Sequence, residues 1–397
     1  MLTMKHQILI IGGGNAGISI ASQLLAKDSS LDIAIVDGSE KHYYQPAWTL
    51  VGGGAFNIED TVRDEEDVMP KGVKWIKAFA DKIDAKNNKI KLDNKDIVEY
   101  EYLIAAPGIQ CNWGEIKGLE ETLGKNGVTS NYRFDLAPYT YKCIQNTKNG
   151  LAVFTQPNTP IKCGGAPMKI MFLASDYFRK NKSGNKVQFM SGGGRIFGVD
   201  KYEKQLKKII ERYQISPTLN VKMTEIDGKN KVATFIGFGD GNKDKEYKVK
   251  FDMIHVTPPQ SAPDFIKESP LANEAGWIDV DKNSLQHTKF PNVFAAGDVA
   301  GIPVSRTGAA IRKQAPILVE NLLAVMRGNM ADHSYDGYSS CPIVTGYGKL
   351  ILAEFDYTNT PKETFPFDQS KERWTMWVLK KYLLPFFYWT RILPGKM

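Results

Sequence analysis

The 397-residue chain has 42% hydrophobic residues, 51 lysines and arginines against 44 acidic residues, and four cysteines. This composition is ordinary for a globular protein of two or three domains, and so few cysteines argue against a disulfide scaffold and for a reducing compartment. No charge-free apolar run approaches the roughly twenty residues that a transmembrane helix needs. The chain enters a strand pattern almost at once, so we expect no signal or transit peptide.

A dinucleotide fingerprint at the N-terminus is the most specific pattern. An apolar run over residues 8–11 precedes Gly12-Gly13-Gly14-Asn15-Ala16-Gly17, a helical pattern follows, and a second apolar run ends in Asp37. Gly12 permits a tight turn, Gly14 lets the backbone approach a pyrophosphate, and Gly17 lets the helix pack on the strand. Asp37 can accept hydrogen bonds from an adenosine ribose. The stretch predicts a βαβ unit that binds a dinucleotide.

A second motif selects the cofactor. An apolar strand pattern over residues 292–296 ends in Gly297-Asp298, and a helix-forming segment follows over residues 305–325. An acid at this point can bind a ribityl hydroxyl while the next helix N-terminus faces the pyrophosphate. Together with the N-terminal unit, the motif predicts FAD rather than NAD. A capping role for Asp298 is the alternative.

A second βα unit begins near residue 151. Its strand pattern at 186–191 runs into Gly192-Gly193-Gly194, and a helical pattern follows over residues 202–213. The third glycine of a nucleotide fingerprint comes one residue late, Phe197 takes the close-packing position, and no acidic ribose residue follows. We therefore predict a second Rossmann-like domain whose NAD(P)H site has degenerated.

Cys163 precedes the helical pattern of residues 168–178. The positive end of a helix dipole favours a thiolate there, whereas a buried inert cysteine is the alternative. His255 has apolar neighbours, and we expect it to be a core residue rather than a base.

The C-terminal segment, residues 371–397, holds much of the positive charge. It carries Lys371, Arg373, Lys380, Lys381, Arg391 and Lys396 against one acid, Glu372. Aromatic residues lie between these cations, and no recognised nucleic-acid motif accompanies them. Such a pattern is typical of a membrane interface, and packing in the core is the alternative. We expect the segment to associate with a membrane surface and not with nucleic acid.

The chain resembles the sulfide:quinone oxidoreductases, specifically their mitochondrial-type branch, which are flavoproteins with two dinucleotide-binding domains. The matching segments follow one order along nearly the whole chain: residues 12–17, 44–52, 157–163, 196–199, 255–259, 297–298, 340–342, 346–347, 352–357 and 363–368.

The resemblance implies that Cys163 and Cys341 form a redox pair, each passing through a persulfide, and that Cys111 and Cys143 are structural. Implied FAD contacts are Gly12, Gly13, Gly14, Asn15, Ala16, Gly17, Asp37, Gln45, Ala78, Gly108, Gly297, Asp298, Arg306 and Lys349. Arg306 stands where the family pattern has lysine. Lys349 is a candidate for stabilising reduced flavin or a quinone oxygen, with an ordinary surface lysine as the alternative. Tyr347, Phe355 and the C-terminal aromatics are expected to line a quinone slot, and no metal is expected.

The implied chemistry is attack by hydrogen sulfide on a sulfur bridge between the two cysteines, which yields a persulfide and a thiolate. FAD then passes two electrons to a membrane quinone, and the sulfur goes to a small thiol or anionic acceptor or leaves as polysulfide. We expect Cys163 to carry the persulfide that is handed on and Cys341 to be the thiolate beside the flavin, although the roles could be exchanged.

The predicted fold is α/β, with two Rossmann-like domains in tandem and a membrane-associating C-terminal segment. We expect an FAD domain over residues 1–140 and 285–330, a second domain over 141–284, and a quinone and membrane region over 331–397. The expected location is the cytoplasmic face of the cell membrane, with a homodimer possible. A type II NADH:quinone oxidoreductase, or a flavin-containing sulfide sensor or membrane scaffold, are the alternative functions.

Overall fold

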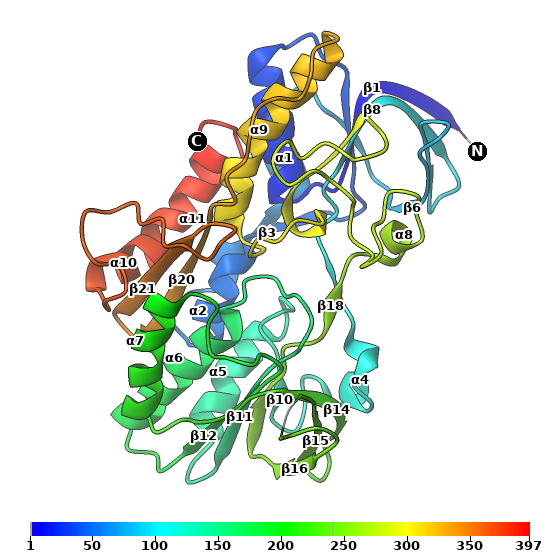
Figure 1. Cartoon of the computed structure of the whole chain (residues 1–397). Helices are drawn as coiled ribbons and strands as arrows, with labels where there is room; N and C mark the ends of the chain where they lie inside the picture. The colour runs from blue at the N-terminus through cyan, green and yellow to red at the C-terminus, as the bar shows by residue number, and fades with distance from the viewer. Residues whose placement is uncertain (1, 240) are drawn as a thin grey trace.

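The computed structural model describes residues 2–239 and 241–397, and a largely parallel sheet lies in each half of the molecule (Figure 1). The larger sheet has the strand order β5-β2-β1-β8-β7-β6, and β19 also pairs with β8. Its strands are β1 (Thr3–Ile11), β2 (Ile33–Val36), β5 (Lys74–Ile76), β6 (Ala80–Asp84), β7 (Lys89–Leu92), β8 (Ile97–Ala105) and β19 (Val293–Ala295). The apolar end of β1 is buried on both faces, as expected of a central parallel strand.

Two helices follow the strands that the motifs predicted. α1 (Asn15–Lys27) comes directly after β1, and α9 (Gly308–Met326) follows β19 and packs beside α1. The predicted βαβ unit and the helix after Gly297-Asp298 are therefore confirmed. Both helices begin at the carboxyl ends of parallel strands, where ligands of such sheets bind.

The second sheet has the order β10-β17-β11-β12-β13, with every pair parallel. Its strands and crossover helices are β10 (Val128–Thr129), β11 (Leu151–Gln156), α6 (Ala166–Lys180), β12 (Lys186–Ser191), α7 (Asp200–Arg212), β13 (Ser216–Thr218) and β17 (Met253–His255). This is a second Rossmann-like domain, as predicted. The chain order reverses direction beside β11, so the crevice of this sheet lies at the end of β11.

That order corrects the place assigned to the second nucleotide site. The glycines at 192–194 follow β12, which is the second strand and not the first. The loop after β11, where a nucleotide-binding domain carries its glycine fingerprint, instead carries Cys163.

Smaller elements complete the two halves. An antiparallel sheet consists of β14 (Val221–Asp227), β15 (Val232–Gly237) and β16 (Glu246–Lys250). The strands β3 (Lys41–Tyr43) and β4 (Val62–Asp64) form an antiparallel pair. The remaining helices before the C-terminal region include α2 (Trp48–Gly52), α3 (Glu65–Val68), α4 (Leu119–Thr122), α5 (Ala137–Asn146) and α8 (Asp264–Lys267).

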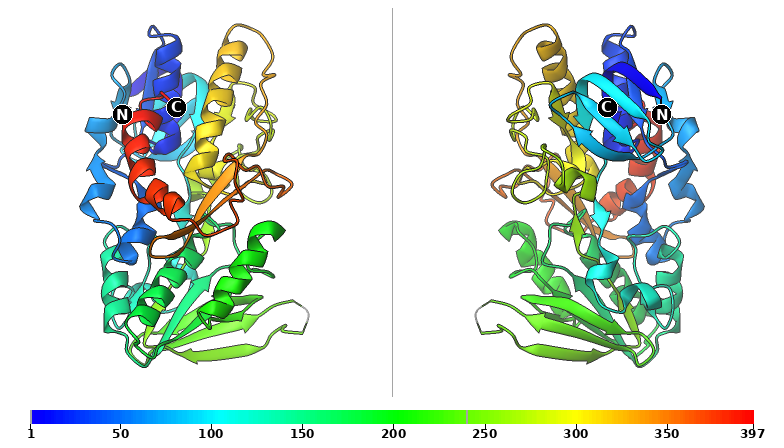
Figure 2. Two further views of the ribbon diagram at one scale, coloured as in Figure 1. Left: turned by 90° about the vertical axis from the view of Figure 1, so that its left-hand side faces the viewer. Right: turned by 90° about the vertical axis from the view of Figure 1, so that its right-hand side faces the viewer.

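The C-terminal region joins the two halves. A hairpin of β20 (Ser339–Gly346) and β21 (Lys349–Phe355) packs on α6. Helices α10 (Trp374–Val378) and α11 (Leu384–Phe387) follow, with π-helical turns after each. Figure 2 shows these helices in red beside the blue N-terminal unit, and Ser22 Oγ donates to the Leu393 carbonyl at 2.7 Å. Among the described residues, no helix combines the length and apolar character needed to cross a membrane.

The domain crossings differ from the expected boundaries. The chain leaves and re-enters the first half through β9 (Gln110–Cys111) and β18 (Gln260–Ser261), which pair with each other. β10 already belongs to the second sheet, and Ile266 and Leu271 are buried in the core of the first half. The crossings thus lie earlier than the expected changes at 140/141 and 284/285, because these short segments carry no periodic pattern of their own.

Candidate functional site

The glycine turn after β1 forms a cradle that only glycine permits. A Cβ on Gly12 would lie 2.4 Å from the Ala106 carbonyl oxygen, and a Cβ on Gly17 would lie 1.9 Å from that of Gly12. By contrast, a Cβ on Gly14 would meet no atom within 4 Å. The open space is therefore at Gly14, where the fingerprint predicts that a pyrophosphate approaches the N-terminus of α1. Asn15 and Ala16 open that helix.

Residues at the end of β2 lie beside the glycine turn, where the fingerprint predicts the adenosine ribose. The Gly13 amide donates to Asp37 Oδ2 at 2.6 Å, which holds the acid beside the turn. The Asp37 amide in turn donates to the Ile76 carbonyl at the end of β5, two residues before the buried Ala78. Asp37 and Ala78 are therefore brought to the same edge of the sheet as the glycine turn.

Glu65 is a buried acid that sequence reasoning missed. His42 Nδ1 lies 3.2 Å from Glu65 Oε2, and His42 Nε2 lies 2.6 Å from the hydroxyl of Tyr388 in the C-terminal segment. Burial raises the pKa of Glu65 against the lowering effect of His42. Glu65 Oε1 has no hydrogen-bond partner and faces Gly13. A buried acceptor left unpaired beside this turn fits a ligand that brings hydroxyl donors, as FAD does.

The opposite wall of the cradle comes from the ends of β8 and β19. Gly108 has a φ of +74° and faces open space, and Gly297 has a φ of +76° and donates its amide to Gln314 Oε1 at 2.8 Å. A Cβ on Gly297 would lie 3.4 Å from the Ala16 Cβ, so this turn abuts the start of α1. The residues present fit FAD: two glycine turns and two helix N-termini face one space, with Asp37 and Asp298 at its ends.

Lys162 links the cradle to the cysteine loop. Its Nζ donates to Gln45 Oε1 at 2.6 Å and lies 3.6 Å from Asp298 Oδ2. Arg306 donates from Nε to the Asp298 carbonyl at 2.7 Å, its guanidinium stacks 3.9 Å above Trp277, and burial lowers its pKa. Gln45 and Asp298, both expected to contact the cofactor, thus meet at a lysine that sequence reasoning did not identify.

Cys163 and Cys341 meet at the interface of the two halves. Their sulfur atoms lie 3.5 Å apart, and both cysteines are free thiols. Cys163 has a left-handed φ of +55°, and its amide donates to the Arg306 carbonyl at 2.8 Å. A Cβ on Gly165 would lie 2.6 Å from Cys341 Sγ, so a glycine is needed where α6 begins. The structure therefore brings together the two cysteines that the resemblance paired.

A buried lysine distinguishes the two thiols. Lys169 Nζ donates to Cys163 Sγ at 3.0 Å, and this side chain is 4% exposed. The hydrogen bond from Cys341 and the charge of Lys169 hold the pKa of Cys163 well below its usual value. The hydrogen bond to Cys163 and burial raise the pKa of Cys341 well above its usual value. Burial opposes a charge on Lys169, but the two cysteines raise its pKa. These surroundings favour a thiolate at Cys163 over one at Cys341.

A second buried lysine comes from the C-terminal segment. Lys380 is 3% exposed, and its Nζ donates to the Pro46 carbonyl at 2.8 Å. Burial and the charge of Lys169 lower the pKa of Lys380 to about 7, although the nearby cysteines oppose the shift. Of the two buried lysines, only Lys169 could have been recognised from the sequence, because it interrupts the apolar run Met168–Leu173. Lys380 was attributed to a membrane-facing surface, whereas the structure buries it.

Two expected site residues lie elsewhere. Phe355 is buried and packs edge-on against Phe197 at 5.9 Å, so it is a core residue and not part of a slot. Lys349 is the first residue of β21, beside the hairpin turn, whereas Cys341 pairs with Ala353 four residues further along the strand. At about 3.3 Å per residue, Lys349 lies about 13 Å along the strand from that pair. Its charge helps to lower the pKa of Glu372, so the surface alternative fits. Tyr347 keeps a half-buried position, with its hydroxyl donating to the Gly53 carbonyl at 2.5 Å.

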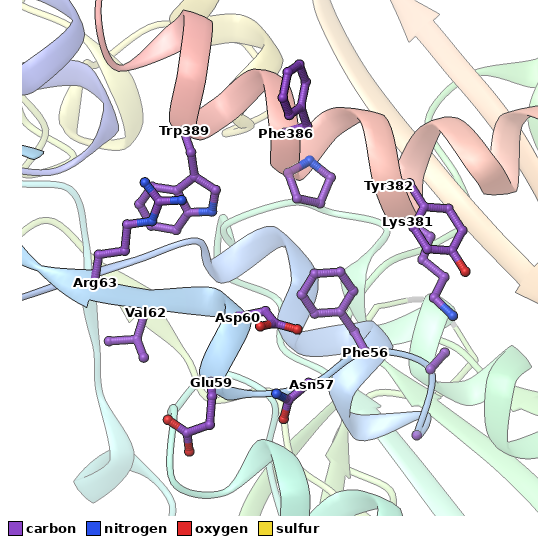
Figure 3. Close-up of a pocket in the computed structure, with 13 residues that line it drawn as sticks. Phe56, Asn57, Glu59, Asp60, Val62, Arg63, Lys381, Tyr382, Phe386 and Trp389 are labelled. Atoms are coloured by element: carbon purple, nitrogen blue, oxygen red, sulfur yellow. The ribbon is translucent and has the colours of Figure 1, made fainter.

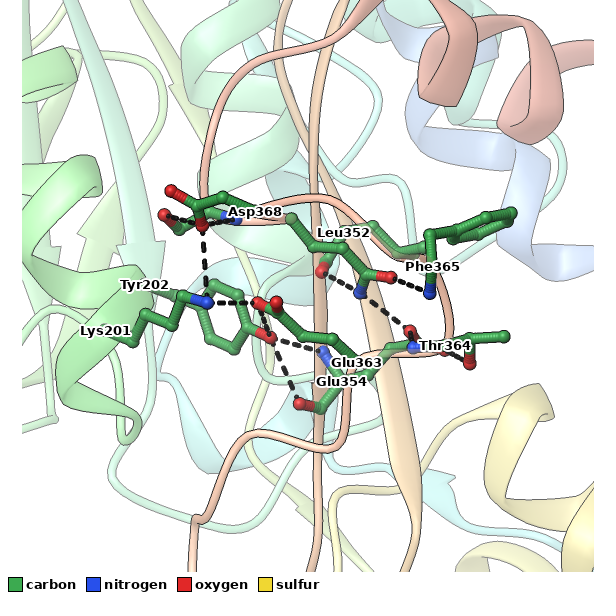
Figure 4. Close-up of polar contacts among 10 residues, drawn as sticks. Lys201, Tyr202, Leu352, Glu354, Glu363, Thr364, Phe365 and Asp368 are labelled. Atoms are coloured by element: carbon green, nitrogen blue, oxygen red, sulfur yellow. Dashed lines mark hydrogen bonds and ion pairs between the residues drawn. The ribbon is translucent and has the colours of Figure 1, made fainter.

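The segment after β21 is fixed by a buried acid, Glu354. Glu354 accepts from the Thr364 amide at 2.8 Å (Figure 4) and from Gln369 Nε2 at 2.7 Å. The Tyr338 hydroxyl also contacts Glu354. Nearby, Lys201 pairs with Glu363 at 2.7 Å. These bonds hold residues 363–369 against the start of α7.

The environments of Cys111, Cys143 and His255 indicate structural roles. Burial raises the pKa of Cys143 to about 11 and also raises that of Cys111. Burial lowers the pKa of His255 to about 3, and its Nε2 accepts from the Asn131 amide at 2.9 Å. His255 is therefore a neutral core residue, as expected.

The C-terminal helices present two faces. Met376, Trp377, Lys380 and Tyr388 are buried, whereas Trp374 is 67%, Tyr382 57% and Phe386 56% exposed. The segment thus combines core packing with an exposed aromatic face.

Comparison with known proteins gives consistent matches. A family profile described as pyridine nucleotide-disulphide oxidoreductase matches residues 6–316. The mitochondrial sulfide:quinone oxidoreductase of Dictyostelium discoideum is 46% identical over 98% of this chain and 86% of its own length. The protein of the same name from Mus musculus is 44% identical over 98% of this chain and 87% of its own. The solved sulfide:quinone oxidoreductase of Aquifex aeolicus shares the fold, with a TM-score of 0.83 at 19% identity, covering 98% and 92% of the two chains.

These names correct one expectation. Both relatives are named mitochondrial, so the predicted location on the cytoplasmic face of a cell membrane was wrong. The location had been inferred from the missing leader pattern, which is a weak basis for it.

Proposed function

Because this chain belongs to the sulfide:quinone oxidoreductase family, we propose that Cys163 and Cys341 carry its sulfur chemistry. The chain is a flavin-dependent oxidoreductase, FAD is its cofactor, and sulfide and a quinone are its substrates. The observation that carries the proposal is the 3.5 Å approach of the two sulfur atoms, with Lys169 at 3.0 Å from one of them. No other pair of cysteines in the described residues makes such a contact.

The two sulfur atoms are spaced to share a sulfur bridge. A bent sulfur atom bonded at about 2.05 Å to both cysteines holds them about 3.3 Å apart. The 3.5 Å gap therefore accommodates one bridging sulfur atom, and an approach of about 1.5 Å closes it to a direct disulfide.

We assign the two roles in the reverse of the order expected from the sequence. In thiol–disulfide exchange the thiol with the lower pKa leaves faster. From the direct disulfide, hydrosulfide attack on Cys341 Sγ forms a new S–S bond there and breaks the bond between Cys341 and Cys163. Cys163 leaves as a thiolate that Lys169 holds, and Cys341 keeps the persulfide. A small thiol or anionic acceptor then takes the outer sulfur atom from Cys341.

Contacts between the proposed cofactor residues and the cysteine loop support an electron acceptor on the Cys163 side of the pair. Bound FAD would supply the two-electron acceptor for the sulfur centre and the electron donor for the quinone. Gly14, Gly108 and Asp298 would hold it, and Lys162 lies between that cradle and the cysteine loop. The bond from the Cys163 amide to the Arg306 carbonyl fixes the thiolate relative to the cradle.

The C-terminal helices are proposed to meet a membrane. Their exposed Trp374, Tyr382 and Phe386 match the aromatic residues found at lipid–water interfaces. Tyr347 and Trp377, whose rings lie 6.4 Å apart, are candidates for the quinone route from this surface. The names of the relatives point to a mitochondrial membrane.

A trapping experiment tests the assignment of the sulfur atoms. The FAD-loaded enzyme is mixed with sulfide without quinone, quenched with an alkylating reagent, digested and analysed by mass spectrometry. We expect one added sulfur atom on the Cys341 peptide and an alkylated, sulfur-free Cys163 peptide. Sulfur found only on Cys163 would reverse the two roles, and sulfur on neither would contradict the relay.

A further inference from the structure

An open pocket of about 790 Å³ lies between the C-terminal helices and the segment that leads into β4 (Figure 3). Its walls consist of Gly54, Ala55, Phe56, Asn57, Glu59, Asp60, Val62, Arg63, Lys381, Tyr382, Pro385, Phe386 and Trp389. Lys380 turns inward to the Pro46 carbonyl, whereas its neighbour Lys381 lines this pocket. The pocket is therefore separate from the cysteine site.

Charged side chains of both signs surround the pocket without pairing. The guanidinium of Arg63 stacks 4.3 Å from the ring of Trp389, and Lys381 Nζ lies 5.1 Å from the ring of Tyr382. Glu59 and Asp60 lie on the facing segment and are exposed. Within residues 2–239 and 241–397, none of these four side chains forms an ion pair. Two cations and two carboxylates are thus available to a ligand.

This combination fits a zwitterion attached to an apolar group. Arg63 and Lys381 suit a phosphate. Asp60 and the face of Phe56 suit a quaternary ammonium, which aromatic rings and carboxylates bind. A purely anionic headgroup would face the two carboxylates, and an uncharged quinone would leave all four charges unused. The exposed Tyr382 and Phe386 stand at the rim, where the glycerol and acyl chains of a lipid would continue.

We propose that this pocket binds the headgroup of a zwitterionic phospholipid of the phosphocholine type. The inference rests on the proposed contact between the C-terminal helices and a membrane. It adds a specific site to that contact, in which phosphate lies against Arg63 and the ammonium lies towards Asp60.

Charge variants separate a headgroup site from general attraction to a membrane. The FAD-loaded full chain and the variants Arg63→Gln and Asp60→Asn are sedimented with phosphatidylcholine vesicles. We expect each variant to bind about three- to tenfold more weakly, the range expected from losing one charged contact. Lys371→Gln is the matched control, because it removes a cation from the same segment outside the pocket, and its affinity should change by less than about twofold. Thermal unfolding and FAD content verify that each variant is folded.

The variant Asp60→Asn distinguishes a headgroup site from general electrostatic attraction to the membrane. Removing a carboxylate makes the surface more positive, so general electrostatics predicts unchanged or stronger binding, whereas a zwitterion site predicts weaker binding. Unchanged or stronger binding overturns the headgroup site. Release of the wild-type chain from the vesicles by a short-chain, water-soluble quinone also overturns it, in favour of a quinone site. If the wild-type chain does not bind phosphatidylcholine vesicles, the proposed membrane contact fails with it, and sulfide-dependent flavin reduction shows separately whether the sulfur chemistry stands.

Discussion

Lys169 Nζ lies 3.0 Å from Cys163 Sγ in a buried site where the charge of each group stabilises the other. Replacing Lys169 with Met removes the cation and raises the pKa of Cys163, since a nearby opposite charge lowers a pKa by about one to three units. We expect the rate of Cys163 alkylation at pH 7 to fall about tenfold or more. Lys180→Met on the same helix is the control, because Lys180 pairs with Asp176 instead. Equal alkylation rates in both variants would show that Lys169 does not maintain the thiolate.

The buried Lys380 makes stability depend on pH. Its pKa is lowered to about 7 in the folded chain, by burial and then by Lys169, and returns to about 10.4 on unfolding. The unfolded chain therefore binds more protons between these values, and this group's contribution to the free energy of unfolding rises as the pH rises from about 7 towards 10.

Lys380→Met removes that dependence. We expect the variant to be more stable than the wild type near pH 6, by a few kcal/mol, with the difference shrinking as the pH rises to 9. Denaturant unfolding of both proteins across this pH range measures the difference. A variant that is less stable by the same amount at every pH would contradict the burial of an uncharged lysine.

Two glycines of the fingerprint should separate cofactor binding from folding. Gly14→Ala places a methyl group in open space, so the free energy of unfolding of the cofactor-free chain should stay within about 0.5 kcal/mol while FAD affinity falls. Gly17→Ala pushes a methyl group into the Gly12 carbonyl, so both quantities should fall. Unfolding curves and FAD titration of the apo-protein measure them. Normal FAD affinity in Gly14→Ala would remove this turn from the cofactor site.

The absence of a side chain at Gly165 should be essential for the position of Cys341 beside Cys163. A methyl group there would lie 2.6 Å from Cys341 Sγ and would displace it, whereas a methyl group on Gly164 would meet no atom within 4 Å. We expect Gly165→Ala to lower sulfide-dependent quinone reduction about 100-fold, the cost of misplacing a reacting atom by about 1 Å. Gly164→Ala should leave the rate within about twofold, and both variants should retain FAD. Similar rates for the two variants would show that the position of Cys341 is not critical.

The sequence predicted those parts of the site that depend on short, continuous motifs. The turn at Gly12 to Gly17 and the Gly297-Asp298 motif each combine a strand, a turn and a helix within one continuous stretch, so their geometry follows from local rules. The pairing of Cys163 with Cys341 came from the family resemblance, because nothing local joins residues 178 positions apart.

The parts that were missed depend on tertiary packing. Lys380 sits in a segment rich in cations, and only the packing of its helix against Pro46 distinguishes it from the exposed Tyr382 two residues later. Phe355 was expected to line the slot with Tyr347, but the strand β21 is buried on both faces from Leu350 onwards, so Phe355 packs in the core. The glycines at 192–194 were misplaced because strand order cannot be read from a single βα unit.

Stopped-flow observation of the flavin tests whether Cys163 and Cys341 deliver electrons from sulfide to FAD. The FAD-loaded wild type, Cys163→Ser and Cys341→Ser are each mixed with sulfide, and in parallel with NADH, in the absence of oxygen and quinone. We expect rapid loss of oxidised-flavin absorbance with sulfide in the wild type only, little loss with NADH, and full FAD content in all three proteins. Rapid reduction by sulfide in either serine variant, or reduction by NADH and not by sulfide in the wild type, would contradict this expectation.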